Sequence, residues 1–135
     1  MSEAFKLDPR LERDTVEVAV WPLCLVRLMN DRRFPWLVLV PHRAGIREPM
    51  DLPVTAQEAL WHEILRAARA LKSVTMAEKM NIGMLGNVVP QLHAHVVARF
   101  AGDAAWPGPV WGAGVREPYA EDALSDVVAR VRAAL

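Results

Sequence analysis

The segment from Gln91 to Phe100 constrains the fold more than any other part of the chain, because its side chains alternate in character. In a β-strand, successive side chains point to opposite faces. One face would carry Gln91, His93, His95, Val97 and Arg99, and the other Leu92, Ala94, Val96, Ala98 and Phe100. The second set is typical of a core face, so we expect a strand over residues 92–100 with that face in the protein interior.

Three further strands are predicted by β-rich runs that end at turn-forming residues. They span residues 23–29, 36–40 and 78–85. The polar residues 30–33 separate the first two runs, which favours a hairpin. Gly86 and Asn87 interrupt the chain between the third run and the alternating segment.

Two helices are expected. The first runs from Thr55 to Lys72, because Thr55 and Glu58 have the spacing of a capping box. Its apolar stripe would consist of Trp61, Ile64, Leu65, Ala68 and Leu71. The second helix is predicted within residues 119–135, after the acidic pair Glu121 and Asp122. Its stripe would consist of Leu124, Val127, Val128, Val131 and Leu135.

The chain of 135 residues has no internal repeat and no dividing linker, so we expect one domain over residues 1–135. Residues 1–14 are polar and predict a surface arm or a short helical lead-in. Residues 101–118 are rich in Trp, Pro and Gly. Exposed tryptophans would form a large apolar patch, so we expect this loop to be ordered and to pack on its own sheet.

Composition excludes several classes of protein. The formal net charge is zero, which argues against a nucleic-acid or membrane partner, and arginines such as Arg33 beside turns are typical of solvated faces. Cys24 is the only cysteine, so neither an intramolecular disulfide nor a cysteine-based zinc site can form. We expect Cys24 to be a small buried hydrophobe. With no apolar stretch of spanning length, the protein is expected to be cytoplasmic.

From the spacing alone, three interpretations of His93 and His95 are open. They could be half-exposed strand residues with satisfied hydrogen bonds. They could bind a metal, but that site would need a third ligand, and His42 and His62 are the only other histidines. They could serve nucleophilic catalysis, in which one imidazole attacks an electrophile and its neighbours stabilise charge.

Three stretches resemble the signature of the histidine-triad (HIT) superfamily, in which His-φ-His-φ-His-φ-φ follows a Gly-rich approach. They are Asn81-Ile82-Gly83, Gly86-Asn87 and Gln91-Leu92-His93-Ala94-His95-Val96-Val97. The resemblance covers roughly residues 20 to 100. It implies an α+β fold, with an antiparallel five-stranded sheet, one long helix and a C-terminal helix, and pairing into a homodimer.

The resemblance implies a nucleotidyl hydrolase or transferase that acts on a nucleoside phosphate, phosphoramidate or dinucleoside polyphosphate. His93 matches the nucleophile, which forms a nucleotidyl-histidine. His95 and Gln91 match the other two positions of the catalytic triad. The expected nucleotide and phosphate contacts are Asn87, Asn30, Gly86 and Arg99. The implied chemistry requires no metal and no cofactor.

Two positions depart from the pattern of the superfamily. Gln91 replaces the first histidine, and an amide donates and accepts hydrogen bonds but carries no proton charge. Val88 stands where many members have Ser or Thr, so a hydroxyl is missing. These departures suggest an alternative function, namely a non-catalytic module of the same fold that binds a nucleotide or a phosphorylated metabolite.

Overall fold

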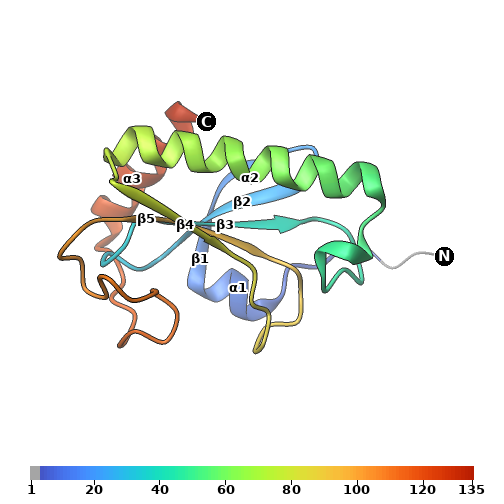
Figure 1. The fold of residues 1–135 in the computed structure, drawn as a ribbon, viewed down its shortest axis with the longest axis horizontal. Helices are drawn as coiled ribbons and strands as arrows, with labels where there is room; N and C mark the ends of the chain where they lie inside the picture. The colour runs from blue at the N-terminus through green and yellow to red at the C-terminus, as the bar shows by residue number, and fades with distance from the viewer. Residues whose placement is uncertain (1–3) are drawn as a thin grey trace.

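A computed structural model describes residues 4–135 and shows an α+β fold built on one antiparallel sheet (Figure 1). The strands are β1 (Thr15–Val20), β2 (Cys24–Met29), β3 (Trp36–Pro41), β4 (Lys79–Gly83) and β5 (Ala94–Arg99). Their order across the sheet is β1-β2-β3-β5-β4, and every neighbouring pair is antiparallel. The helices are α1 (Pro9–Asp14), α2 (Val54–Thr75) and α3 (Glu121–Ala134), with a 3-10 turn, η1, at Pro49–Asp51. The expected five-stranded α+β architecture is confirmed.

The predicted hairpin of β2 and β3 is confirmed, with Val26 opposite Leu39 in its register. Strand β1 was absent from the elements that we expected from the residues alone. Its pairing with β2 shifts between Glu17 and Ala19, where a bulge occurs. A bulge inserts an extra residue and breaks the period of two, so alternation along this strand is irregular.

Helix α2 differs from the prediction in its start and in its buried face. It begins at Val54, Pro53 occupies the N-cap position without a side-chain hydrogen bond, and the expected capping box is wrong. Trp61 and Leu65 are 48% and 44% exposed, so the predicted stripe is rotated from the true one. The buried positions are Ala56, Leu60, Glu63, Ile64, Ala67, Ala68, Ala70 and Leu71.

Glu63 explains the rotation, because an acidic residue lies at the centre of the buried face. Its two carboxylate oxygens accept hydrogen bonds from the backbone N–H of Leu23, at 3.0 Å, and of Cys24, at 2.8 Å. These two donors precede and begin β2, so the carboxylate joins α2 to the sheet. Cys24 is fully buried, as expected, and burial followed by the Glu63 charge raises the pKa of its thiol.

Both faces of the sheet are covered. Helix α2 packs on one face, whereas α1 and the tryptophan loop (residues 101–118) lie on the opposite side (Figure 1). The core beneath α2 includes Leu92, Ala94, Val96 and Ala98, which confirms the predicted core face of the alternating segment. The opposite face forms a second buried cluster of Leu11, Phe34, Trp36, Val38, Val40, Val97 and Val110.

A helix lies near each end of the described chain. A short helix, α1, follows residues 4–8, and residues 1–3 of the predicted arm lie outside the described part of the chain. Helix α3 packs against α2 and β1 through its predicted apolar stripe, of which Val131 is buried. Within residues 4–135 no helix combines the length and the apolar character needed to cross a bilayer.

Candidate active site

His93 and His95 lie where β5 begins, on the face opposite α2. Strand β5 pairs with β3 from Ala94 onward, where Ala94 lies opposite Leu39, and with β4 from His95 onward, where His95 lies opposite Gly83. His93 therefore immediately precedes the paired strand. The two side chains are 7% and 6% exposed, so the interpretation as half-exposed strand residues is wrong. Their ring centroids are 4.8 Å apart and the planes are inclined by 73°.

The hydrogen bonds of the two imidazoles assign opposite tautomers. Nδ1 of His93 lies 2.7 Å from the backbone oxygen of Gln91. A carbonyl oxygen only accepts, so Nδ1 of His93 carries the proton and Nε2 keeps its lone pair. The indole N–H of Trp36 donates to Nδ1 of His95 at 3.0 Å, so the proton of neutral His95 is on Nε2. The site thus combines a free imidazole lone pair with a neighbouring imidazole donor.

His95 is enclosed by aromatic rings. The centroids of Trp36 and Trp111 lie 5.6 Å and 5.4 Å from its own. Burial, followed by the charge on a protonated His93, lowers the pKa of His95 to about 3. His95 is therefore neutral at pH 7 and supplies a hydrogen bond from Nε2 without carrying charge.

Trp111 connects the tryptophan loop to the histidines. A Cβ added to Gly83 would lie 3.0 Å from Cη2 of Trp111, so any larger residue would press on the indole where it lies over β4. Val110, next to it, is 3% exposed and belongs to the second buried cluster. The loop packs on its own sheet, as expected, and the same contact accounts for the glycine of the Asn81-Ile82-Gly83 stretch.

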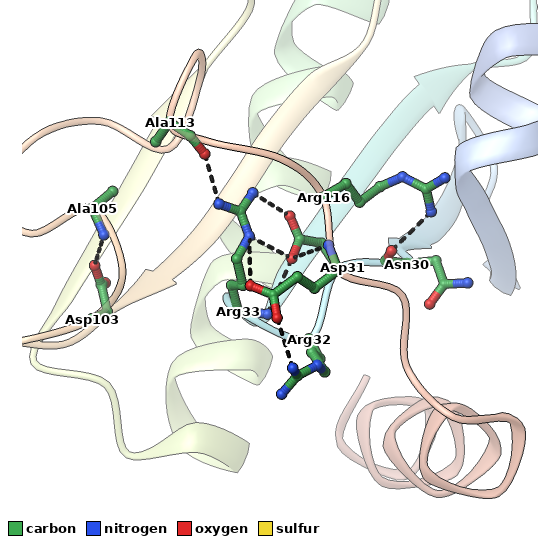
Figure 2. Close-up of polar contacts among 9 residues, drawn as sticks. Asn30, Asp31, Arg32, Arg33, Asp103, Ala105, Ala113 and Arg116 are labelled. Carbon is green, nitrogen blue, oxygen red and sulfur yellow. Dashed lines mark hydrogen bonds and ion pairs between the residues drawn. The ribbon is translucent and has the colours of Figure 1, made fainter.

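Arg99 anchors the tryptophan loop. Its guanidinium donates to both carboxylate oxygens of Asp103, at 2.8 Å and 3.0 Å, to Oδ1 of Asn81 at 2.8 Å and to the backbone oxygen of Gly108 at 2.8 Å. Asp103 in turn accepts from the backbone N–H of Ala105 (Figure 2). Arg99 is 1% exposed. This placement corrects the expected phosphate contact, because the guanidinium holds the loop.

The turn between β2 and β3 is tied to the end of the same loop (Figure 2). Arg33 donates to both carboxylate oxygens of Asp31, at 3.0 Å and 2.8 Å, and to the backbone oxygen of Ala113 at 2.6 Å. Its side chain is only 12% exposed, so the expectation of a solvated arginine is wrong here. Arg116 adds a bond to the backbone oxygen of Asn30.

Asn30 faces the C-terminal part of the chain. Its side-chain oxygen accepts from the backbone N–H of Tyr119 at 2.9 Å, while its own N–H donates to the backbone oxygen of Asp14. The first bond holds the segment that leads into α3, and the second joins the turn to the end of α1. The expected nucleoside contact of Asn30 stays a prediction.

A hollow of about 320 Å³ adjoins His93 between η1 and the loop that joins β4 to β5. Its lining comprises Arg47, Glu48, Pro49, Met50, Met84, Leu85, Gly86, Leu92 and His93. Gly86 adopts a φ of +71°, a conformation that favours glycine and turns this loop beside the hollow. Asn87 follows it and is exposed, but it does not line the hollow.

A second hollow, of about 350 Å³, lies beside His95 and is walled by Trp36, Trp111, Arg33 and Arg116 among others. Each of the two histidines thus lines a concave region of its own. Of the predicted site residues, the structure brings together His93, His95 and Gly86, and Gln91 joins them through its backbone oxygen. It places Asn30, Asn87 and Arg99 elsewhere.

Sequence reasoning missed the walls contributed by residues 47–50. Arg47 and Glu48 bring opposite charges and Met50 an apolar surface to the first hollow. The sequence carries no periodic or motif signal for them, since they lie in a segment marked only by Gly45 and Pro49.

A metal ion bound by His93 and His95 would need a third protein ligand, and the described residues place none beside them. Among residues 4–135 no three His, Cys, Asp or Glu side chains gather as potential ligands of one ion. His42 bonds through Nε2 to the backbone oxygen of Trp21 at 2.9 Å, and His62 is exposed on α2.

Solved structures of similar proteins match nearly the whole chain. A histidine triad protein from Sinorhizobium meliloti 1021 is 52% identical, with a TM-score of 0.95 and 97% of each chain covered. One from Bradyrhizobium japonicum is 42% identical, with a TM-score of 0.94 over 97% of this chain and 98% of that one. One from Marinobacter aquaeolei VT8 is 42% identical, with a TM-score of 0.96 over 98% and 97%.

No match is found among curated proteins. The HIT domain family matches residues 10–102, somewhat more than the range over which the resemblance was expected. This match covers most of the chain and includes both histidines with the glycine-containing approach to them. The chain therefore belongs to the HIT domain family, a family of nucleotide-binding or nucleotide-hydrolysing proteins.

Proposed function

We propose that the protein is a nucleotidyl hydrolase or transferase that uses Nε2 of His93 as its nucleophile. One observation carries the proposal: the bond from Nδ1 of His93 to the Gln91 oxygen leaves Nε2 with its lone pair, in a side chain that lines a hollow. An imidazole in this tautomer forms a bond to an electrophilic phosphorus without first losing a proton. The substrates we propose are nucleoside phosphates, phosphoramidates and dinucleoside polyphosphates.

The reaction would proceed in two displacements. In the first, the Nε2 lone pair forms a P–N bond, and the bond from phosphorus to the leaving group breaks with its electron pair. The leaving group takes up a proton from solvent. In the second, water attacks phosphorus, loses its proton to solvent and displaces Nε2, which regains its lone pair. If an alcohol or phosphate attacked in place of water, the nucleotidyl group of the same intermediate would be transferred to it instead of being hydrolysed.

His95 would stabilise the charge that develops on the phosphoryl oxygens. Its Nε2–H lies on the imidazole whose centroid is 4.8 Å from that of His93. Because the pKa of His95 is about 3, its imidazole is neutral near pH 7 and does not act as an imidazolium acid. It acts through a preorganised hydrogen bond, which requires no reorganisation when the transition state forms.

Gln91 favours a second candidate function. Both polar atoms of its side chain bond to the backbone of residues 6 and 8, so they are directed away from a substrate. A site without a proton-carrying group at this position could bind a nucleotide or a phosphorylated metabolite and leave it intact. Isothermal titration with nucleotides separates the two functions, because tight binding without product supports the binding module.

Turnover of a substrate panel tests the proposed activity. Wild type, His93→Ala and the control His62→Ala, which removes an exposed imidazole on α2, would be compared on phosphoramidates and dinucleoside polyphosphates. We expect His93→Ala to lose on the order of 10³-fold or more of the turnover, because the nucleophile is absent. Equal turnover by wild type and His93→Ala would reject the role of His93.

We further propose that the protein pairs as a homodimer. Strand β4 is at one edge of the sheet, and α2 exposes the large apolar side chains of Val54, Trp61 and Leu65. An edge strand and an exposed apolar helix face are both surfaces that proteins commonly cover. Sedimentation equilibrium of wild type and Trp61→Glu tests this, and a monomeric wild type would reject it.

A further inference from the structure

We propose that Gln91 is a positioning residue: its side-chain amide ties the leading segment (residues 4–8) to the backbone that carries His93, and thereby holds the His93 imidazole in one orientation. The inference deepens the proposed function and rests on it for its effect on catalysis. Its structural part concerns only the orientation of a side chain, and this part is measurable without any substrate.

His93 needs such support because it lies outside the sheet. The backbone pairing of β5 begins at Ala94 with β3, and with β4 it reaches only to His95. One backbone bond holds the preceding segment, from the N–H of Leu92 to the oxygen of Ile46 at 3.0 Å. The nucleophile is thus attached to a stretch of chain that the strand ladders do not fix.

The side chain of Gln91 supplies a second attachment on the other side of that stretch. Its Oε1 accepts from the backbone N–H of Asp8 at 2.8 Å, and its Nε2 donates to the backbone oxygen of Lys6 at 2.8 Å. The backbone oxygen of the same residue accepts from Nδ1 of His93. Gln91 therefore binds the leading segment through its side chain and, through its backbone oxygen, accepts the hydrogen bond that sets the tautomer of His93.

The leading segment is itself firmly placed. Leu7 packs against the second buried cluster, and the ring of Phe5 meets His42 edge-on with centroids 6.4 Å apart. At the end of the segment, the carboxylate of Asp8 accepts from the backbone N–H of Arg10, whose guanidinium donates to the backbone oxygen of Val88 at 3.1 Å. The segment thus bridges the core and the loop that contains Gly86.

A glutamine suits this task better than a titrating side chain. The amide offers one donor group and one acceptor at every pH, and both are needed at the same time by Asp8 and Lys6. The departure from the triad pattern at this position therefore provides a pH-independent clamp instead of a proton carrier.

A pair of substitutions at residue 8 isolates one half of the clamp. Asp8 has a φ of −56°, close to the value that proline imposes, so Asp8→Pro removes the N–H without opposing the backbone conformation. Asp8→Ala removes the carboxylate but keeps the N–H. Gln91→Ala removes both bonds of the amide. Gln57→Ala is the matched control, since it deletes an amide that bonds a backbone oxygen at 2.8 Å on α2.

The ring ¹⁵N signals of His93 report its tautomer in each variant, and thermal melting verifies that each is folded. We expect a single Nδ1–H tautomer in wild type, Asp8→Ala and Gln57→Ala. Gln91→Ala and Asp8→Pro should instead show averaged tautomers and, with a turned-over substrate, a kcat about tenfold lower at nearly constant KM. The double variant that combines Asp8→Pro with Gln91→Ala should lose no more activity than Gln91→Ala alone, because both changes break one clamp.

Unchanged His93 signals in folded Gln91→Ala would overturn the inference, as would equal changes in Asp8→Ala and Asp8→Pro. Failure of the proposed function is distinguishable from this result. In that case wild type turns over no member of the panel, while the tautomer shift in Gln91→Ala and Asp8→Pro is still observed. If His93→Ala abolishes turnover but Gln91→Ala leaves the tautomer intact, the function stands and the clamp is rejected.

Discussion

His95→Asn is expected to flatten the dependence of the free energy of unfolding on pH in mildly acidic solution. The wild-type imidazole is buried between Trp36 and Trp111, and burial, followed by the charge of His93, lowers its pKa from 6.5 to about 3. The folded state therefore resists protonation of a group that the unfolded chain protonates readily. Asparagine keeps an acceptor near the indole N–H of Trp36 but does not titrate.

The magnitude follows from the two pKa values. Above pH 6.5 neither state binds the proton, and the effect is absent. Between pH 6.5 and about 3 only the unfolded state binds it, so wild type loses about 1.4 kcal/mol of stability for each pH unit of acidification. At pH 5 the loss amounts to about 2 kcal/mol. Below about pH 3 both states are protonated, and the loss reaches a plateau.

Urea denaturation followed by tryptophan fluorescence, at steps from pH 8 to pH 4.5, measures this dependence for wild type and variant. The range stops at pH 4.5 so that a second group does not add to the dependence. The Arg99 guanidinium lowers the pKa of Asp103, so the stability that Asp103 contributes to the folded state is lost as the pH falls through about 4 and below. His62→Asn is the matched control, since that imidazole is exposed on α2.

The difference in slope is the quantity that matters, because His95→Asn also removes packing and lowers stability at every pH. We expect the difference between wild type and variant to shrink by about 2 kcal/mol from pH 7 to pH 5. Parallel curves for the two proteins over this range would refute the reasoning that His95 is held neutral by burial.

Three other substitutions test the packing around the site. Glu63→Leu leaves two buried N–H groups at the start of β2 without an acceptor and should cost about 2–4 kcal/mol in urea denaturation; a cost below about 0.5 kcal/mol would contradict this. Gly83→Ala places a Cβ 3.0 Å from Trp111, so it should displace the indole and raise the pKa of His95 in an NMR titration, whereas an unchanged pKa would count against the contact. Arg99→Lys loses the planar fork that serves three partners, so limited proteolysis should cleave the tryptophan loop faster than in wild type, and an equal rate would disprove the anchoring role.

Local patterns were sufficient for much of the fold. The alternation in residues 92–100 identified a core face that the structure buries, since a strand with one apolar face has a period of two. The same reasoning failed for β1, where the bulge near Glu17 and Ala19 breaks that period. It also misplaced the buried face of α2, because Glu63 is buried by serving backbone donors that lie about 40 residues away in the sequence.

The site was predictable only in part, for a similar reason. His93 and His95 stand in a recognisable motif, but their tautomers depend on Gln91 and on Trp36, and the second of these is 59 residues distant from His95. Arg99 binds Asn81 and Gly108 as well as the nearby Asp103, and Asn30 binds Tyr119, which is 89 residues away. The bond of Arg99 to Gly108 depends on the path of the tryptophan loop, and that of Asn30 on the segment after the loop, and no periodicity encodes either path.

Trapping the intermediate tests the central claim most directly. Wild type would be mixed with a nucleoside phosphoramidate, quenched in denaturant at alkaline pH to preserve the P–N bond, and analysed by intact-mass and peptide mass spectrometry. We predict one nucleoside monophosphoryl group per chain, attached to the peptide that contains His93 and absent from His93→Ala. Product formation without any adduct on wild type, or an adduct that persists in His93→Ala, would contradict His93 as the nucleophile.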